Sequence, residues 1–256
     1  MRRASASGAV RNEAIVERLR DLKSHHPFWG YRHCWAHLRY VDRLDVNKKR
    51  VYRLMQAHQL LATQTTHDVP RVSTRSKPRP DRPNQWWGID MTKAMTESGW
   101  AYVVVVKDWY TKKVVGHSCG RTSTASEWLI ALDRAVNRQF PYGVRDRQLH
   151  LMSDNGSQPT SEKFMQACSL MGIHQAFTSY NNPKGNADTE RMMRTLKEEL
   201  IWLREWRDPY ELSTAIDGWM ETYNETWLHS ALGYRTPNQF EETYNLTTGT
   251  LLENAG

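Results

Sequence analysis

The chain has 256 residues, of which 39% are hydrophobic, and a formal net charge of +7 at pH 7. This length suffices for one sizeable core with a smaller attached module, and no apolar run approaches the roughly 20 residues that a membrane-spanning helix needs. The three cysteines, Cys34, Cys119 and Cys168, form no CxxC pair, so the sequence predicts neither a disulfide framework nor a zinc ribbon.

The charge is distributed unevenly along the chain. Residues 1–84 contain 18 Lys or Arg and 7 Asp or Glu, whereas residues 85–256 contain 17 and 21. A basic front part next to a mildly acidic remainder favours a polyanion-binding arm on a catalytic body, although a solvated charged surface would give the same counts. The polar start lacks the apolar segment of a signal peptide, which predicts a cytosolic protein.

Residues 1–61 are predicted to form a helical domain. Apolar residues recur at helical spacing around 14–22, 31–38 and 47–55, with a turn marked by Pro27 and Gly30 and a plausible N-cap at Asn47. The third helix presents four basic residues over little more than a turn and a half: Lys48, Lys49, Arg50 and Arg53. This pattern indicates a helix-turn-helix reader of DNA, or alternatively a small helical bundle with a basic surface.

Four potential metal ligands lie close together in this region: His25, His26, Cys34 and His37. They include a single thiol, and their spacing fits no standard zinc site. We therefore interpret them as residues of the helix surfaces.

Residues 62–84 are predicted to be a linker. They contain four prolines, several hydroxyl residues and almost no large apolar side chains. An extended basic segment of this kind could follow a phosphate backbone, and it separates the two predicted domains.

Residues 85–205 have the pattern of a mixed α/β domain. Three strands, at 86–91, 100–109 and 113–120, are joined by short turns and predict an antiparallel meander. A helix that begins near Ser123 or Thr124, a strand at 149–153, a helix at 161–171, a strand at 174–179 and a long helix at 189–203 follow. The predicted order is βββαβαβα, and residues 206–256 are predicted to be a C-terminal helical extension.

Three acidic residues occupy positions where ligands gather in α/β proteins. Asp90 is predicted to end the first strand, Asp154 follows the fourth, and Glu190 lies in the first turn of the last helix. Alone, Asp154 before Asn155 and Gly156 would indicate only a turn. Together the three could hold two divalent metal ions for phosphodiester chemistry. Asp108 is a rival acid that we interpret as a turn residue.

The last predicted helix has two faces. At about 100° per residue, one stripe is apolar and consists of Met193, Leu196, Leu200 and Leu203. A second stripe contains Glu190, Arg194 and Lys197. Glu190 could be a solvated ion-pair partner of Arg194, or a metal ligand beside two cations that contact DNA phosphates.

These residues carry a resemblance to a known family. The gap of 35 residues between Asp154 and Glu190, Lys197 seven residues after Glu190, and the segments SDNGSQPTSEKF, SYNNPKGNADTERMMRTLKEEL and YNETWLHSALGYRTPNQF are all similar to those of one group. FWGYRHCWAHL and VNKKRVYRLMQAHQLL resemble its helix-turn-helix segment. The chain thus resembles the OrfB-type DDE transposases of bacterial insertion sequences, which have the retroviral-integrase catalytic core. It departs from them at Trp227-Leu228-His229, where such proteins often have Arg-Pro-His.

The resemblance implies a ribonuclease-H-like fold and a catalytic site of Asp90, Asp154 and Glu190 that holds two Mg²⁺ or Mn²⁺ ions. It implies hydrolysis of a phosphodiester at the element's end, followed by attack of the freed 3′-hydroxyl on a second phosphodiester. Lys184, Arg194 and Lys197 are expected to contact DNA, with Lys184 in a loop at residues 181–186. The implied partners are double-stranded DNA, at least one further copy of the chain, and an upstream OrfA or an OrfAB fusion, at the bacterial nucleoid.

Two other functions remain open from the sequence. One is a ribonuclease-H-like nuclease on the same fold, which the 35-residue spacing and the basic arm disfavour. The other is a non-catalytic DNA-binding regulator, which three converging carboxylates disfavour. Most of the numerous tryptophans are interpreted as core or interface residues rather than as base-stacking groups.

Overall fold

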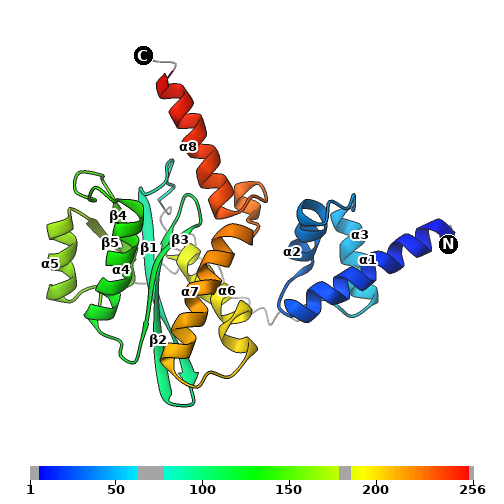
Figure 1. The fold of residues 1–256 in the computed structure, drawn as a ribbon, viewed down its shortest axis with the longest axis horizontal. Helices are drawn as coiled ribbons and strands as arrows, with labels where there is room; N and C mark the ends of the chain where they lie inside the picture. Colours follow the sequence, from blue (N-terminus) through cyan, green and yellow to red (C-terminus); the bar gives the residue numbers. More distant parts are fainter. Residues whose placement is uncertain (1–5, 63–77, 179–185, 254–256) are drawn as a thin grey trace. The chain divides into compact units, whose positions relative to one another are not determined.

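The computed structural model describes residues 6–62, 78–178 and 186–253. The chain divides into two compact units, Met1–Arg71 and Val72–Gly256, which Figure 1 shows with their helices and strands labelled. The division falls inside the predicted linker at 62–84, of which residues 63–77 lie outside the described part of the chain. The exact limits of the domains stay predictions.

The first unit is helical. Its elements are α1 (Ala6–His25), α2 (Tyr31–Ala36), the π-helical turn η1 (His37–Val41) and α3 (Lys48–Ala57). Leu19, Leu38 and Val51 are fully buried at its centre, as the helical spacing predicts. The predicted N-cap is also present, because the Asn47 side chain accepts a hydrogen bond from the Lys49 backbone at 2.7 Å.

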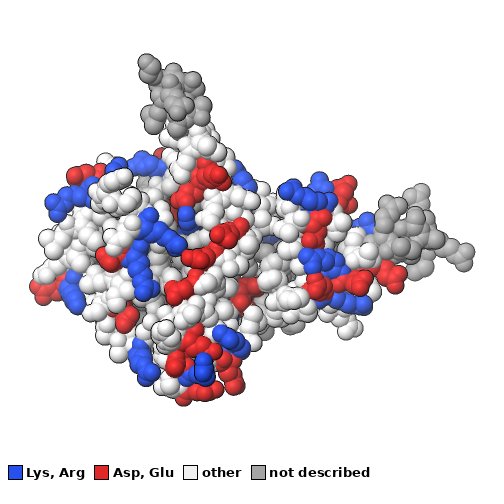
Figure 2. All heavy atoms as spheres, viewed as in Figure 1, with Lys and Arg blue, Asp and Glu red and all other residues white. Residues whose placement is uncertain are grey.

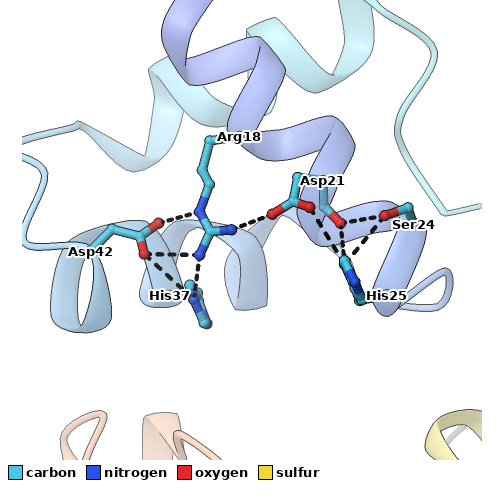
Figure 3. Close-up of polar contacts among 6 residues, drawn as sticks. All are labelled: Arg18, Asp21, Ser24, His25, His37 and Asp42. Carbon is cyan, nitrogen blue, oxygen red and sulfur yellow. Dashed lines mark hydrogen bonds and ion pairs between the residues drawn. The ribbon is translucent and has the colours of Figure 1, made fainter.

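A polar network joins the helices of this unit (Figure 3). The Arg18 guanidinium on α1 donates to both carboxylate oxygens of Asp42, at 2.9 and 3.0 Å, and its side chain also contacts Asp21 and His37. Two parallel bonds of this kind fix the relative orientation of a guanidinium and a carboxylate. Arg18 therefore ties α1 to the end of η1.

The second unit contains a five-stranded mixed sheet. The strands are β1 (Trp86–Thr96), β2 (Gly99–Asp108), β3 (Val114–Gly120), β4 (His150–Ser153) and β5 (His174–Phe177). Their order in the sheet is β3-β2-β1-β4-β5, with antiparallel pairing among the first three strands and parallel pairing of β1 with β4 and of β4 with β5. The predicted meander and the order βββαβαβα are confirmed.

Helices cover both faces of the sheet (Figure 1). On one face, α4 (Ala125–Gln139) and α5 (Glu162–Met171) enclose a core that includes Trp87, Leu132 and Phe164. On the other face, α6 (Ala187–Glu199) and α7 (Pro209–Thr226) enclose a second core that includes Val105, Leu196 and Ile216. Because α7 contributes to this core, the predicted boundary at residue 205 does not separate two cores.

The last helix of the predicted α/β pattern is shorter than expected. The sequence predicts one helix over 189–203, but α6 ends at Glu199, and Leu200 has φ −139° and ψ −62°. A short 3-10 helix, η2 (Ile201–Leu203), follows. Burial of Ile201 and Trp206 turns the chain here, and the Trp206 indole donates to the Ile201 carbonyl at 3.0 Å.

The turn between β2 and β3 is organised by Asp108, as its interpretation as a turn residue requires. Its buried carboxylate accepts hydrogen bonds from the backbones of Asn84, Tyr110 and Thr111 and from the Thr111 hydroxyl. Burial raises the pKa of Asp108, while these bonds oppose that rise. Asp108 is thus occupied with the fold.

The chain ends with η3 (Ser230–Leu232) and α8 (Pro237–Glu253), the latter leading away from the sheet in Figure 1. The rings of Phe240 and Tyr244 pack against Tyr110 at its base. Within the described residues, no helix is long and apolar enough to cross a membrane.

Candidate active site

The site lies where the central strand β1 continues beyond the last residue that it pairs with β4. β1 pairs with β4 only as far as Gly88 opposite Met152, whereas its pairing with β2 continues to Thr96. Asp90 was predicted to end its strand, and this is wrong, because β1 runs six residues further. Asp90 instead follows the point where β4 stops, and continuing the β1–β4 register places it opposite Asp154.

Asp154 comes directly after β4 and is exposed. Its Oδ1 accepts a hydrogen bond from the Gly156 backbone at 3.0 Å, which forms the predicted turn. The Asn155 side chain donates to the Thr178 carbonyl at 2.6 Å, which links the end of β4 to the residue after β5. Asn155 thus holds the loop that carries Asp154.

Glu190 reaches the site because α6 approaches β1 closely. A Cβ on Gly88 would overlap Thr189 Oγ1 and lie 2.5 Å from the Trp109 indole nitrogen and 2.8 Å from Asn186 Oδ1. Only glycine leaves room for the helix at this distance. Trp109 Nε1 donates to Thr189 Oγ1 at 3.2 Å, and this bond fixes the residue next to Glu190.

Further polar contacts hold the start of α6. The Asn186 amide donates to the Ile89 carbonyl at 3.2 Å, on the edge of β1 that β4 no longer covers. The ammonium of Lys107 donates to the Asp188 carbonyl at 3.2 Å, and that of Lys112 pairs with the Asp188 carboxylate at 3.1 Å. These bonds anchor the first turn of α6 to β1 and β2.

Asp90 and Glu190 line one hollow of about 430 Å³, together with Met91, Thr92, Met193, Arg194, Lys197 and Trp202. The pKa of the Asp90 carboxyl is raised to about 6, first by burial and then by the negative charges of Asp154 and Glu190. The Lys197 ammonium and a hydrogen bond from the Met91 backbone act in the opposite direction. The charges of the other two predicted acids, Asp154 and Glu190, therefore both act on Asp90.

The chemistry of this donor set suits a divalent cation. Carboxylate oxygens are the ligands that Mg²⁺ prefers, and a bound cation would offset the negative charges of Asp154 and Glu190 that act on Asp90. In the described residues no three His, Cys, Asp or Glu side chains form a group that could hold a metal ion. Asp90 and Glu190 line the same hollow and Asp154 follows the end of β4, but the three acids do not form a closed ligand set in the described residues.

The two cations on α6 differ in their surroundings. Arg194 is mostly exposed, and its Nε donates to the Glu198 carboxylate at 2.7 Å. Lys197 lines the hollow, and its charge lowers the pKa of Asp90. Lys184, the other cation expected near this site, lies outside the described residues.

Comparisons with known proteins identify the family. The family described as "Integrase core domain" matches residues 80–183 and, through a second match of the same description, residues 171–237; an "HTH-like domain" matches residues 11–67. The two integrase-core matches together span more than half of the chain. The chain belongs to the integrase-core transposases.

Similar proteins agree with this assignment. The putative transposase for insertion sequence element IS986/IS6110 of Mycobacterium tuberculosis is 27% identical over 260 residues, which cover 92% of each protein. Transposase InsD for insertion element IS2D of Escherichia coli is 27% identical over 237 residues, which cover 86% of this chain and 77% of InsD. A chain of the simian T-cell lymphotropic virus intasome, solved with the PP2A regulatory subunit B56 gamma, has the same fold with a TM-score of 0.53 and 18% identity, over 87% of this chain and 74% of that one.

As a member of this family, the transposase is a polynucleotidyl transferase that acts in DNA transposition and integration. The fold class predicted from the sequence, a ribonuclease-H-like mixed sheet of order βββαβαβα with an N-terminal helix-turn-helix domain, is confirmed. Family membership also favours transposition over the ribonuclease and the non-catalytic regulator.

In the helix-turn-helix unit, the four predicted DNA contacts of the transposase are not equivalent. Arg50 donates to Asn12 Oδ1 from two nitrogens, at 3.0 and 2.7 Å, and the Lys48 ammonium lies 4.1 Å from the centre of the Trp35 ring. Lys49 and Arg53 are exposed on α3. Arg50 and Lys48 thus contact the neighbouring helices α1 and α2, whereas Lys49 and Arg53 face solvent.

On the face that Figure 2 shows, Lys and Arg side chains of the described residues alternate with Asp and Glu on each unit of the transposase. Cys34, one of the rejected zinc ligands, is buried, and burial raises the pKa of its thiol to about 11. The thiolate that zinc needs is therefore disfavoured at Cys34.

Sequence reasoning missed two contributors to the site. Gly88 was not singled out, although a glycine inside a strand often marks close approach of another backbone. Trp202 was grouped with the core and interface tryptophans, but it is 58% exposed and lines the hollow. Its place could not be inferred, because it depends on the helix break at Leu200.

Proposed function

We propose that the transposase cuts and joins DNA at Asp90, Asp154 and Glu190, which hold two Mg²⁺ or Mn²⁺ ions. One observation carries the proposal: Asp90 shares a hollow with Glu190, and the charges of both Glu190 and Asp154 raise its pKa. Asp154 and Glu190, both remote from Asp90 in the sequence, disfavour the ionised form of the buried Asp90 carboxyl, and a bound divalent cation would offset that effect.

The reaction follows from these residues and the substrate. Bound divalent cations would activate the attacking oxygen and stabilise the leaving oxygen of an in-line displacement. In the first step, a water oxygen forms a bond to phosphorus and the bond from phosphorus to the 3′-oxygen breaks, which frees a 3′-hydroxyl. In the second step, that hydroxyl forms the new bond to a phosphorus of another strand, whose own 3′-oxygen leaves.

Basic side chains are proposed to hold the DNA. Lys197 and Arg194 lie at the hollow and would contact the phosphates next to the reacting bond, while Lys49 and Arg53 would contact the DNA at the helix-turn-helix unit. Joining two element ends implies at least two copies of the chain on DNA. By family resemblance, an upstream OrfA or an OrfAB fusion would contribute to recognition of the ends.

The test is strand joining in Mg²⁺ with a duplex that carries an end of the element encoding the chain. Asp154→Asn keeps an acceptor for the Gly156 backbone bond and removes the charge, so we expect joining to fall at least about 100-fold with DNA binding retained. The matched control is Asp133→Asn on the exposed side of α4, which should join as the wild type does. Chelation of the divalent ion should stop the wild-type reaction, and Mg²⁺ should restore it. Joining by Asp154→Asn at the wild-type rate would refute the site.

A further inference from the structure

Trp202 is the most exposed of the eleven tryptophans, at 58%, yet it lines the same hollow as Asp90 and Glu190. Arg194 and Lys197 line the hollow as well. An exposed indole next to two cations and two carboxylates does not serve to pack a protein core. It is a common combination where nucleic acid binds, because bases stack on aromatic rings while cations hold the phosphates.

The local chain structure places Trp202 there. If α6 continued through residue 203, Trp202 would lie about 120° around the helix from Glu190 and face away from the hollow. The break at Leu200 changes that direction. The buried side chains of Ile201 and Trp206 fix the chain direction after the break, and the Arg204 guanidinium packs 3.9 Å from the centre of the Trp206 ring. Trp206 thus anchors the segment, and Trp202 lies beside Asp90 and Glu190.

From this geometry we propose that Trp202 is a binding site for a nucleobase that leaves the duplex next to the reacting phosphodiester bond. The inference rests on the proposed function, because it places the reacting bond at Asp90, Asp154 and Glu190. A paired base inside a duplex has both faces covered by its neighbours, so only a base that has left the stack offers a face to the indole.

The surroundings favour a base over an apolar protein surface as the occupant. A protein partner that covered Trp202 would also bury Arg194, Lys197 and Glu190, whose desolvation is costly without matched partners. A DNA strand brings phosphates to the two cations and a base to the ring. The hollow, at about 430 Å³, is within the size range of small-ligand sites.

The experiment compares the wild type with Trp202→Ala, Trp202→Phe and Trp100→Ala in the full chain. Trp100 is the control because it is also exposed, at 42%, and does not line the hollow. Strand joining is measured on paired element ends and on ends in which the base pairs next to the reacting bond are mismatched. We expect Trp202→Ala to lose roughly tenfold to a hundredfold on paired ends, Trp202→Phe to keep most of the activity, and Trp100→Ala to match the wild type.

Mismatched ends separate a base-binding role from a structural one. Mismatches lower the cost of unstacking, so the defect of Trp202→Ala should shrink on them. A binding readout without turnover places 2-aminopurine at the same nucleotide and uses Asp154→Asn protein. Its fluorescence should be lower on the Asp154→Asn variant, which keeps the indole, than on the variant that combines Asp154→Asn with Trp202→Ala. An equal defect on paired and mismatched ends, or a defect that follows loss of self-association, would overturn the proposal.

The two proposals fail in different ways. If Asp154→Asn abolishes joining but Trp202→Ala joins paired ends normally, the base-binding site is wrong and the metal site stands. If Asp154→Asn joins normally, the proposed function itself is wrong.

Discussion

Replacing Gly88 with alanine tests how α6 is positioned against the sheet. The backbone of Gly88 cannot yield, because β1 is paired on both sides at this residue, with Lys107 of β2 and Met152 of β4. The added methyl group would overlap Thr189 Oγ1 and crowd Trp109 and Asn186. The start of α6 must therefore move outward, by about 1 Å if ordinary van der Waals separations are to be restored.

The expected cost has two parts. Displacement of α6 breaks or weakens the Trp109–Thr189 and Asn186–Ile89 hydrogen bonds, each worth about 1 kcal/mol. Overpacking adds about 1 to 3 kcal/mol, so the free energy of unfolding should fall by about 3 to 5 kcal/mol. Because Glu190 follows Thr189, a shift of this size should also slow strand joining by about 100-fold.

Urea denaturation and strand joining below the unfolding temperature measure the two effects separately. Gly218→Ala is the matched control: Gly218 is exposed on α7 and has open space around its Cβ position, so alanine should stabilise by up to about 1 kcal/mol. If Gly88→Ala unfolds within about 0.5 kcal/mol of the wild type and joins DNA at the same rate, the packing argument is refuted. Destabilisation with normal joining in the folded protein would show that the position of Glu190 does not depend on Gly88.

Two further predictions concern the helix-turn-helix unit. Arg50→Ala should lower its free energy of unfolding by about 1 to 3 kcal/mol, because two hydrogen bonds to Asn12 are lost. Arg53→Ala should leave the free energy of unfolding unchanged and reduce the salt dependence of DNA binding by about one counterion; an unchanged salt slope would contradict this. Burial lowers the pKa of His33 to about 4 from its ordinary 6.5, so the unfolded chain binds the proton more readily than the folded one. The free energy of unfolding should therefore be highest above pH 6.5 and decline towards pH 4 by at most about 3 kcal/mol. Hydrogen exchange of α3, corrected for the intrinsic effect of pH, should show this decline in the wild type and a smaller one in His33→Phe.

Much of the fold could be predicted because its signals are local. The buried run Val103–Val106 and the short turns on either side of β2 predict the meander, and the Asn47 cap predicts the start of α3. The predicted end of β1 was wrong because residues 92–96 alternate in burial but not in polarity. Thr92, Ala94 and Thr96 are buried whereas Lys93 and Met95 are exposed, which is the pattern of a strand with one covered face.

The rest depends on contacts between distant segments. The break of α6 at Leu200 follows from the burial of Ile201 and Trp206, and helical periodicity carries no information about either. Arg50 donates to Asn12, which lies 38 residues earlier in the chain, and no local pattern predicts that contact. The place of α7 in the second core could have been found from the spacing of Leu212, Ile216, Met220 and Tyr223, which lie on one helix face.

The three acids come from separate elements, but one property of the sheet decides where all of them lie. The pairing of β1 with β2 continues beyond the point where its pairing with β4 ends. The edge of β1 that β4 leaves uncovered offers the Ile89 carbonyl as an acceptor, and Asn186 at the start of α6 donates to it. The end of β4 therefore sets both the turn that carries Asp154 and the point at which the helix carrying Glu190 begins. Since β5 runs parallel to β4 and is tied to it there by Asn155, the 35 residues between Asp154 and Glu190 correspond to a passage through α5 and β5 back to the same sheet edge. The spacing thus reflects the length of one crossover, and it should tolerate changes in α5 that leave the ends of β4 and β5 in place.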